Sequence, residues 1–444
     1  MVARLNRRAR SRSARITDEG VQQLGPSLQL HRFCLGNGLQ VRLLPEHSAP
    51  LISYHTWFRV GSRHEQAGKT GLSHLLEHLM FNETRNLPHG VFDRSVEAVG
   101  GDSNASTWTD WTQYHLELPA SELSLAVRLE SDRMGNLVLR KPLVESEKEV
   151  VANERRMRVE DDLEGEVSEL MYATAFRKHP YHWPTIGWMK DIEGFTAADC
   201  RAFYRRYYAP NNAILVIVGD LKIDRTLKLV QDHYGELDAQ KLPAARAVAE
   251  PRQRAERRKT LRRATPTPKL ALGYPAPAFG DPDHLVVQII SEVLFGGRGS
   301  RLFRQLVDDE QLASELHGSA APFQDPGLYE IWLSVREGRT IAQLEPLIEA
   351  QLSRLATEPL SDDELSRAQN RLELDALQGL QTAAGIADQV GFLETVVGDS
   401  SELLTRIERY RAITTDDVQR VAAALFDPAR RTRIEIVPTA GAQA

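Results

Sequence analysis

The sequence has 444 residues and a formal net charge of −6, and 42% of its residues are hydrophobic. A chain of this length and composition forms a globular protein of two or three domains, and its mild negative charge does not favour nucleic-acid binding. No apolar run reaches the roughly 20 residues that a membrane helix needs, so we expect no membrane span. The two cysteines, Cys34 and Cys200, exclude a disulfide framework and a cysteine-based zinc site as organising features.

Residues 1–27 begin with a stretch that is rich in Arg and Ser and contains no acid until Asp18. We expect this segment to be a solvated basic tail, and an organelle transit segment is the alternative, because such segments share this composition. No apolar signal region is visible in the sequence. The sequence therefore slightly favours a cytoplasmic location, and a periplasmic location stays open if a signal was removed.

The next segments change from a strand pattern to a helix pattern. Residues 28–44 read as strand, turn and strand, and residues 51–62 read as a further strand. From about Gly71 the apolar period becomes helical, with a stripe formed by Leu72, Leu75, Leu76 and Leu79. The sequence thus predicts a helix that begins near Gly71.

The same helix carries the pattern HLLEH at residues 74–78. His74 and His78 are four positions apart, so both imidazoles project from one side of a helix and can bind one tetrahedral zinc ion. Glu77 leans toward the same side, where it can accept a proton from zinc-bound water and pass it to the leaving amine. This order of residues is the inverted-zincin signature. A catalytic zinc site of this kind needs a third protein ligand, normally a carboxylate beside two histidines.

The second half of the sequence repeats part of the first. Residues 195–220 and 413–438 have equal length and align without a gap, and each predicts a helix that starts after a Thr cap and is followed by a strand. A duplication is the simplest explanation of this match. We therefore expect a zinc-binding catalytic domain at 28–240, a basic linker at 241–262 and a second homologous domain without a zinc motif at 263–444.

Four blocks of the sequence resemble one peptidase family, namely 35–46, 61–81, 179–188 and 203–221. They resemble the pitrilysin, insulin-degrading enzyme and mitochondrial processing peptidase family of inverted zincins, and in particular its short-chain bacterial-type branch. The resemblance covers nearly the whole chain. It implies an α+β fold of two homologous domains, each a mostly antiparallel sheet with helices packed on one face. It also implies a zinc-dependent endopeptidase that cleaves extended or unfolded peptides and holds one Zn²⁺ per chain.

The resemblance also assigns the remaining site residues. The helical segment 144–164 resembles the distal glutamate helix of the family, whose metal ligand falls on Glu154, with Glu147 supporting the site from the same helix face. Without the resemblance, either Glu reads equally well as a surface ion-pair partner. Residues 100–118 resemble the substrate-binding edge strand of the family, to which an extended peptide can add as a further strand. This implies that the substrate cleft is lined by Asn104, Ala105 and Ser106.

One block departs from the family pattern. Active members carry an Arg and a Tyr in the second domain that grip the substrate, and the aligned positions here are Val307 and Ser314. The departure implies a heterodimer in which a homologous partner subunit supplies the Arg/Tyr pair, and a homodimer is the other arrangement. Alternatively, the chain is inactive alone, or the missing Arg is replaced by Arg298, Arg301 or Arg304. The competing function is that of a non-catalytic structural or peptide-binding subunit.

Overall fold

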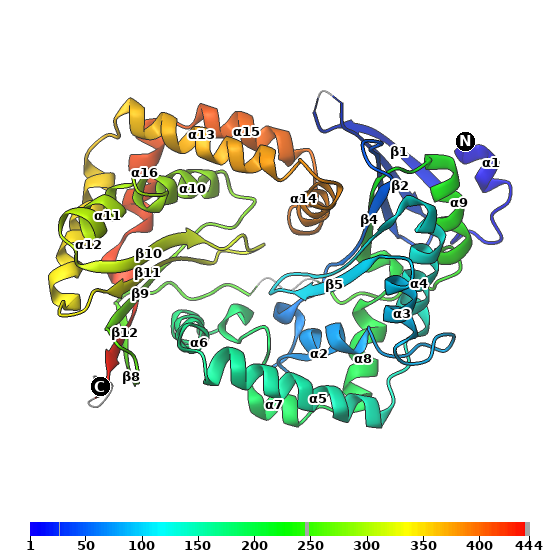
Figure 1. Ribbon diagram of the computed structural model, residues 1–444, viewed down its shortest axis with the longest axis horizontal. Coiled ribbons are helices and arrows are strands. Elements are labelled where there is room, and N and C mark those ends of the chain that lie inside the picture. The colour runs from blue at the N-terminus through cyan, green and yellow to red at the C-terminus, as the bar shows by residue number, and fades with distance from the viewer. Residues whose placement is uncertain (26, 245–247, 440–444) are drawn as a thin grey trace. The chain divides into compact units, whose positions relative to one another are not determined.

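The computed structural model describes residues 1–25, 27–244 and 248–439, which fold into two compact units (Figure 1). Unit 1 is built from residues within Met1–Arg156, Trp183–Ala247 and Gln378–Leu404. Unit 2 is built from residues within Met157–His182, Val248–Leu377 and Thr405–Ala444. Each half of the sequence therefore contributes one internal segment to the unit that is formed mainly by the other half.

Unit 1 contains a seven-stranded sheet in the order β1-β2-β3-β7-β4-β6-β5. Strands β3 and β7 run parallel, and all other neighbours in this sheet are antiparallel. The strands are β1 (Ile16–Gln23), β2 (Gln29–Leu35), β3 (Gln40–Pro45), β4 (Leu51–Phe58), β5 (Asp102–Thr107), β6 (Thr112–Pro119) and β7 (Ala213–Gly219).

Most helices of unit 1 pack on one face of this sheet, where alternate residues such as Tyr54 and Leu215 point into the core. These helices are α2 (Leu72–Leu79), α3 (Val91–Glu97), α4 (Leu123–Asn136), α5 (Lys141–Arg155), α8 (Ala197–Tyr207) and α9 (Ile223–Tyr234). Unit 1 also contains the short helices α1 (Val2–Asn6) and α7 (Met189–Glu193).

The opposite face of the first sheet is covered by α14 (Ala383–Val396), which comes from the second half of the sequence. Its approach to the sheet is close, because a Cβ on Gly391 would lie 1.9 Å from Nε1 of Trp57. A buried ion pair fixes the same helix, in which Nη2 of Arg42 donates to Oε2 of Glu394 over 2.9 Å. Helix α14 is therefore part of the folded core of unit 1.

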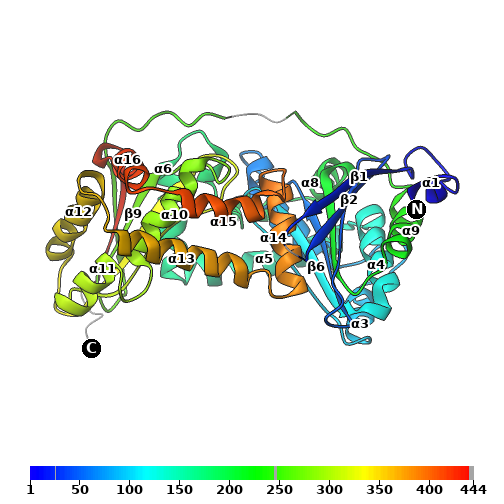
Figure 2. The same cartoon turned by 90° about the horizontal axis from the view of Figure 1, so that it is seen from above.

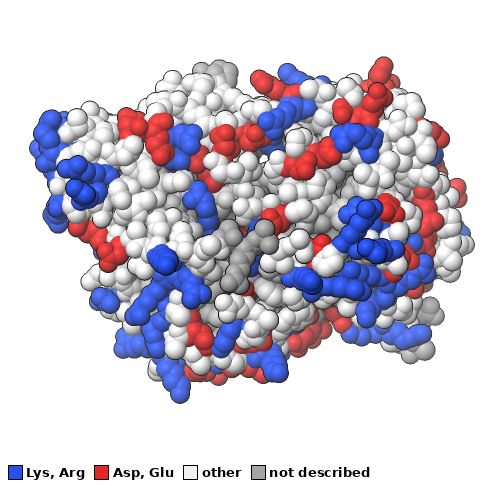
Figure 3. Space-filling view, turned by 180° about the vertical axis from the view of Figure 1, so that it is seen from behind, with Lys and Arg blue, Asp and Glu red and all other residues white. Residues whose placement is uncertain are grey.

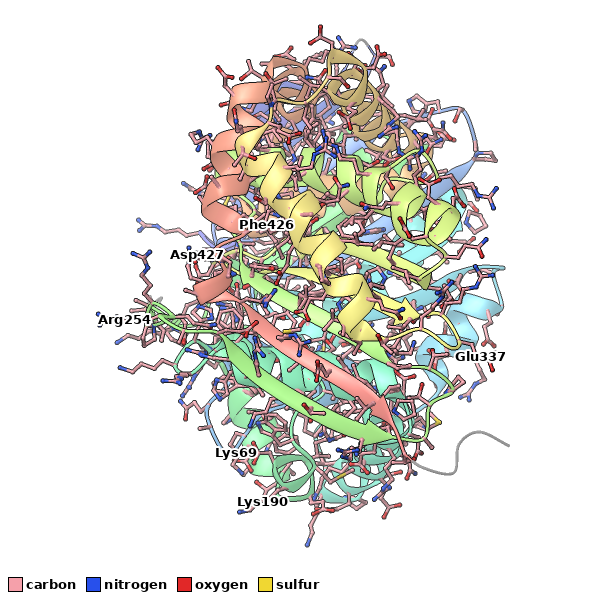
Figure 4. All side chains as sticks on the ribbon, turned by 90° about the vertical axis from the view of Figure 1, so that its left-hand side faces the viewer. Lys69, Lys190, Arg254, Glu337, Phe426 and Asp427 are labelled. Carbon is pink, nitrogen blue, oxygen red and sulfur yellow. The ribbon has the colours of Figure 1, made fainter. Side chains whose placement is uncertain are left out.

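Unit 2 contains a five-stranded sheet in the order β10-β11-β9-β12-β8. Its strands are β8 (Arg257–Arg263), β9 (Lys269–Pro275), β10 (Ala313–Ala320), β11 (Leu328–Val335) and β12 (Thr432–Pro438). Strands β8 and β12 form the single parallel pair of this sheet and lie side by side in Figure 4, where Phe426 marks the turn that leads into β12.

One face of the second sheet packs against α10 (Pro282–Phe295), α11 (Arg301–Phe303), α12 (Ile341–Thr357), α13 (Asp362–Gln378) and α16 (Thr415–Leu425). Figures 1 and 2 show α15 (Glu402–Ala412) beside α13, and Nε2 of Gln369 donates to the carbonyl of Tyr410 over 3.0 Å. The opposite face of the sheet packs against α6 (Leu163–Ala175), which comes from the first half of the sequence. Each repeat therefore gives one helix to the sheet of the other repeat, since α6 packs on the second sheet and α14 on the first.

The expected duplication is visible in the two sheets. The strands β3-β7-β4-β6-β5 and β8-β12-β9-β11-β10 share the same pairing pattern, which is one parallel pair followed by three antiparallel pairs. The helices that precede β7 and β12 start with the same cap, in which Thr196 and Thr414 accept the N–H of the residue three positions later. The expected fold class, two homologous α+β units with mostly antiparallel sheets, is confirmed.

The structure differs from the expected domain boundaries. The expected tail 1–27 is not a solvated tail in its described residues, because β1 pairs with β2 from Ile16↔Leu35 to Gln23↔Gln29. The expected linker 241–262 ends inside β8, while its residues 245–247 lie outside the described ones. The exchanged helices α6 and α14 also cross the boundary drawn between 28–240 and 263–444. A linear division fails because each of these helices buries its apolar side on the sheet of the other repeat.

Within the described residues, no helix is long and apolar enough to cross a membrane. On the face shown in Figure 3, Lys and Arg side chains form several groups that are bordered by Asp and Glu side chains. The basic strand β8 follows this arrangement, since Arg263 pairs with Glu166 and Arg258 pairs with Glu256.

Candidate metal centre

Helix α2 turns the three polar residues of its HLLEH pattern, His74, Glu77 and His78, away from the core of unit 1. The four leucines of its apolar stripe are buried against that core, as the helical period predicts. His74, Glu77 and His78 take the other side of the helix and remain partly exposed. The spacing that buries the leucines thus also presents the three polar side chains together.

The N-terminus of α2 is held by Glu65, a residue that sequence reasoning missed. Its carboxylate accepts the backbone N–H groups of Gly71 and Ser73, each over 2.7 Å. Burial raises the pKa of Glu65 to about 8, against the opposing effect of these hydrogen bonds. Gly71 has a φ of 94°, and a Cβ there would lie 2.4 Å from the carbonyl oxygen of Ile186, so glycine is required where the helix starts.

The three predicted metal ligands come together on α2 and α5. Oε2 of Glu154 lies 3.5 Å from Nε2 of His74 and 3.3 Å from Nε2 of His78. For a tetrahedral zinc ion with bonds of about 2.0–2.1 Å, neighbouring ligand atoms are about 3.3 Å apart. The two distances from Glu154 therefore match two edges of a zinc tetrahedron, and the three ligand atoms lie within 4.8 Å of one another.

The chemistry of the donor set fits zinc as well as its spacing does. Two neutral imidazole nitrogens and one carboxylate oxygen form the three-ligand set of catalytic zinc sites, which leave one coordination position open. The side chains are only 12%, 23% and 14% exposed for His74, His78 and Glu154. Within the described residues, this is the only group of three His, Cys, Asp or Glu side chains with such spacing.

Glu147 lies behind His78, as expected for a supporting carboxylate. Its Oε2 is 3.5 Å from Nδ1 of His78, while Nδ2 of Asn82 donates to its Oε1 over 3.2 Å. The contact with His78 and the hydrogen bond from Asn82 lower the pKa of Glu147, against the effect of burial. Because Nδ1 of His78 faces Glu147, its Nε2 is directed toward Glu154 and the metal position.

Three carboxylates around His78 dominate the electrostatics of the site. Burial disfavours its charged form, but hydrogen bonds to Glu147 and Glu154 and the charge of Glu77 raise its pKa to about 9. Glu77 thus lies close enough to act on the imidazole without being part of the ligand group. A carboxylate at this position can accept and donate a proton beside a bound metal.

Strand β5 forms the edge of the first sheet next to α2, as Figure 1 shows. Asn104 and Ser106 are exposed, but the side chain of Ala105 is 9% exposed and belongs to the core. Ala105 can therefore offer only its main chain to a peptide. Its N–H donates to Oδ1 of Asn104 over 2.8 Å, so a peptide that pairs at this N–H has to displace the Asn104 side chain.

Unit 2 contains the positions at which the family pattern is interrupted. Val307 packs against the second core, and Oγ of Ser314 donates to the carbonyl of Ser334 over 3.3 Å. Arg301 is held by Glu364, with two N–H···O bonds of 2.7 and 2.9 Å. A guanidinium in such a paired geometry is committed to its carboxylate, so Arg301 is not a substitute for the missing Arg, whereas Arg298 and Arg304 are exposed.

Comparison with protein families gives two adjoining matches. Residues 43–187 match the family described as Insulinase (Peptidase family M16), and residues 194–372 match the one described as Peptidase M16 inactive domain. The first match contains the HLLEH pattern and Glu154, and the second contains Val307 and Ser314.

Individual proteins match over nearly the full chain. Zinc protease PqqE of Helicobacter pylori is 32% identical over 91% of this chain and 92% of its own length. The mitochondrial-processing peptidase subunit beta of Lentinula edodes is 24% identical over 90% of this chain and 87% of its own. The crystal structure of a protease from Helicobacter pylori superposes with a TM-score of 0.87 and 31% identity, covering 92% of this chain and 99% of the other.

Proposed function

This chain belongs to peptidase family M16, and we propose that it is a zinc-dependent endopeptidase that cleaves extended or unfolded peptides. One observation carries the proposal: Oε2 of Glu154 lies 3.5 and 3.3 Å from Nε2 of His74 and His78, all three ligand atoms lie within 4.8 Å of one another, and Glu77 stands beside the two histidines on α2. Relatives that are named zinc proteases support the same chemistry.

In this proposal, His74, His78 and Glu154 hold one zinc ion, which supplies a Lewis acid and a water of lowered pKa when it is bound. Glu77 takes a proton from the attacking water and delivers it to the leaving amine. Glu147 keeps the His78 ring in the orientation that directs Nε2 to the metal position. Glu65 fixes the start of α2, and with it the position of both histidines.

The open edge of β5 is the surface that we assign to the peptide. An edge strand has main-chain N–H and C=O groups on one side that no neighbouring strand uses, and an extended peptide can pair with them. Asn104 and Ser106 are exposed along this edge. Main-chain pairing recognises extended peptides largely independently of their sequence, whereas a folded protein does not offer such a strand.

We further propose that full activity requires a homologous partner subunit that supplies an Arg and a Tyr. Val307 and Ser314 stand at the positions of this pair, and Arg301 is engaged by Glu364. Without these donors, the developing negative charge on the scissile carbonyl lacks hydrogen bonds that typically contribute ~10²–10³ in kcat. A similar protein is named a subunit, that of the mitochondrial-processing peptidase.

The test combines zinc content with hydrolysis of a quenched fluorescent peptide mixture. The chain is assayed alone and after co-expression with a homologous chain that carries the Arg and the Tyr. We expect about one zinc per chain, weak hydrolysis alone and strong hydrolysis with the partner. Glu77→Gln should reduce kcat by a factor of ~10²–10⁴ without loss of zinc. Full hydrolysis by the chain alone would refute the need for a partner, and a chain without zinc would refute the peptidase.

The second candidate function is that of a non-catalytic peptide-binding or structural subunit. It is favoured by the match of residues 194–372 to the M16 inactive domain. That match lies outside the segment that carries His74, Glu77, His78 and Glu154. A chain that binds zinc and peptide but hydrolyses nothing, with or without the partner, would establish this second function.

A further inference from the structure

Strand β5 has one exposed row of side chains that continues beyond the strand. Asp102, Asn104 and Ser106 are exposed at every second position, and Trp108 is exposed at the next position of the same series. Successive side chains of a strand point to opposite faces, so residues two apart share a face. Trp108 therefore extends the face of Asn104 and Ser106 at one end of the edge strand.

Trp108 is the most exposed member of a short series of indole rings. Its side chain is 45% exposed, and its ring lies 6.4 Å from that of Trp111 with an angle of 17° between the planes. Trp111 is half-buried, and its ring centroid lies 4.9 Å from that of Trp57, which is 1% exposed. The stack thus leads from the hydrophobic interior of unit 1 to its surface, and presents an apolar ring beside an open strand edge.

The backbone that carries Trp108 is fixed. Its N–H donates to the carbonyl of Trp111 over 2.9 Å, and its carbonyl accepts the N–H of Ser62 over 3.2 Å. Asp110 in the same turn is held as well, because Nη1 of Arg63 donates to its carboxylate over 2.8 Å. The side chain of Asp110 is 3% exposed. An exposed aromatic ring on a fixed backbone loses little entropy when it binds an apolar group, which is typical of recognition sites.

The segment that fixes this turn also fixes helix α2. Residues 61–64 contact the turn at residues 108–110, and the next residue, Glu65, caps the N-terminus of α2. Nε1 of Trp183 donates to the carbonyl of Ser62 over 2.9 Å, which holds the segment from the other side. One short segment, residues 61–65, therefore contacts both the turn that carries Trp108 and the N-terminus of the helix that carries the histidines.

We propose that Trp108, supported by Trp111, forms a specificity subsite for one large apolar side chain of a peptide that lies along β5. This inference rests on the proposed function and adds a side-chain preference to binding through the main chain. The occupant is an aromatic or large aliphatic residue, because the subsite offers a stacked indole face. The one carboxylate of the turn, Asp110, is buried against Arg63 and does not add a charge to the subsite. Because the subsite is fixed relative to α2, the preference applies at one position relative to the scissile bond.

The test measures binding rather than hydrolysis. Zinc-loaded Glu77→Gln protein is titrated with fluorescently labelled ten-residue peptides in which a single Phe is moved through an Ala/Ser host sequence, and Kd is read from anisotropy. We expect Phe at one position to lower Kd roughly tenfold relative to Ala, the discrimination that an apolar pocket gives. Adding Trp108→Ala should remove this difference and leave the Kd of the all-Ala/Ser host within about twofold, whereas Trp108→Phe should retain it. The matched control is Val21→Ala, which removes an exposed apolar side chain from the opposite edge strand, β1.

Three outcomes would overturn the inference: no peptide binds, Phe gives no advantage at any position, or Trp108→Ala weakens every peptide equally. The last outcome would mean that Trp108 only maintains the shape of β5. Failure of the proposed function is recognised separately, from zinc content and hydrolysis by the chain with intact Glu77. A chain that hydrolyses nothing but still prefers Phe through Trp108 would refute the peptidase and leave the subsite standing.

Discussion

Replacing Glu147 by Gln tests whether a carboxylate behind His78 strengthens zinc binding. The substitution keeps the shape of the side chain and the contact with Asn82, but removes the negative charge that lies 3.5 Å from Nδ1 of His78. Loss of a carboxylate in this position typically costs ~10–100-fold in metal affinity. Because 3.5 Å is long for a hydrogen bond and the Glu147 side chain is 19% exposed, we expect the lower end, about tenfold, or about 1.4 kcal/mol.

The assay is competition for zinc between the protein and a chromophoric chelator, with folding checked by circular dichroism. The matched control is Glu145→Gln, which makes the same change of charge on the same helix at a side chain that is 48% exposed and paired with Lys148. We expect this control to retain the zinc affinity of the unmodified chain within about twofold. An unchanged affinity in Glu147→Gln, or an equal loss in both variants, would refute the role assigned to Glu147.

Two further predictions concern pH and the exchanged helix. The pKa of His78 is about 9 in the metal-free chain against an ordinary value of 6.5, so its stabilising charge is fully present below pH 6.5 and is lost as the pH rises through 9. The urea midpoint of metal-free protein should therefore fall as the pH rises over this range. The apparent zinc association constant should rise by up to about tenfold per pH unit over the same range, because zinc must displace the proton on His78. A zinc affinity independent of pH would contradict this account. Replacing Glu394 by Ala leaves the guanidinium of Arg42, 2% exposed, without its buried partner, and breaking such a pair costs ~3–5 kcal/mol. Because Glu19 still contacts Arg42 over 3.1 Å, we expect about 3 kcal/mol in urea unfolding, and a loss below ~1 kcal/mol would show that α14 is held by its apolar contacts alone.

The local part of the metal site could be read from the sequence because it depends on one helix. The spacing of His74, Glu77 and His78 and the leucine stripe of α2 follow from the helical period. Glu154 depends on how two distant helices pack, so it could be assigned only through the family resemblance. Glu65 was missed because its carboxylate caps the helix from outside it, whereas cap patterns describe residues at the helix end itself.

The parts of the fold that the sequence did not predict depend on partners that no local pattern identifies. Strand β1 shows only one buried residue, Ile16, so it lacks the alternation typical of a half-buried strand, and its stability comes from pairing with β2. Helices α6 and α14 each bury a set of apolar residues, but such a set fits either of two similar sheets. Only the folded chain shows that each helix packs on the sheet of the other repeat.

The duplication also allows the metal position in unit 1 to be compared with the equivalent place in unit 2. In the order of elements, α10 follows β9 as α2 follows β4, and α13 is the second helix after β11 as α5 is the second helix after β6. At these places in unit 2, Nε of Arg371 lies 2.6 Å from Oε2 of Glu292, an ion pair that joins α10 to α13. In metal-free unit 1, the raised pKa of His78 similarly places a positive charge between Glu147 and Glu154, which joins α2 to α5 at neutral pH. Both repeats therefore join these two helices through a cation that faces carboxylates, so we expect unit 1 to fold without zinc.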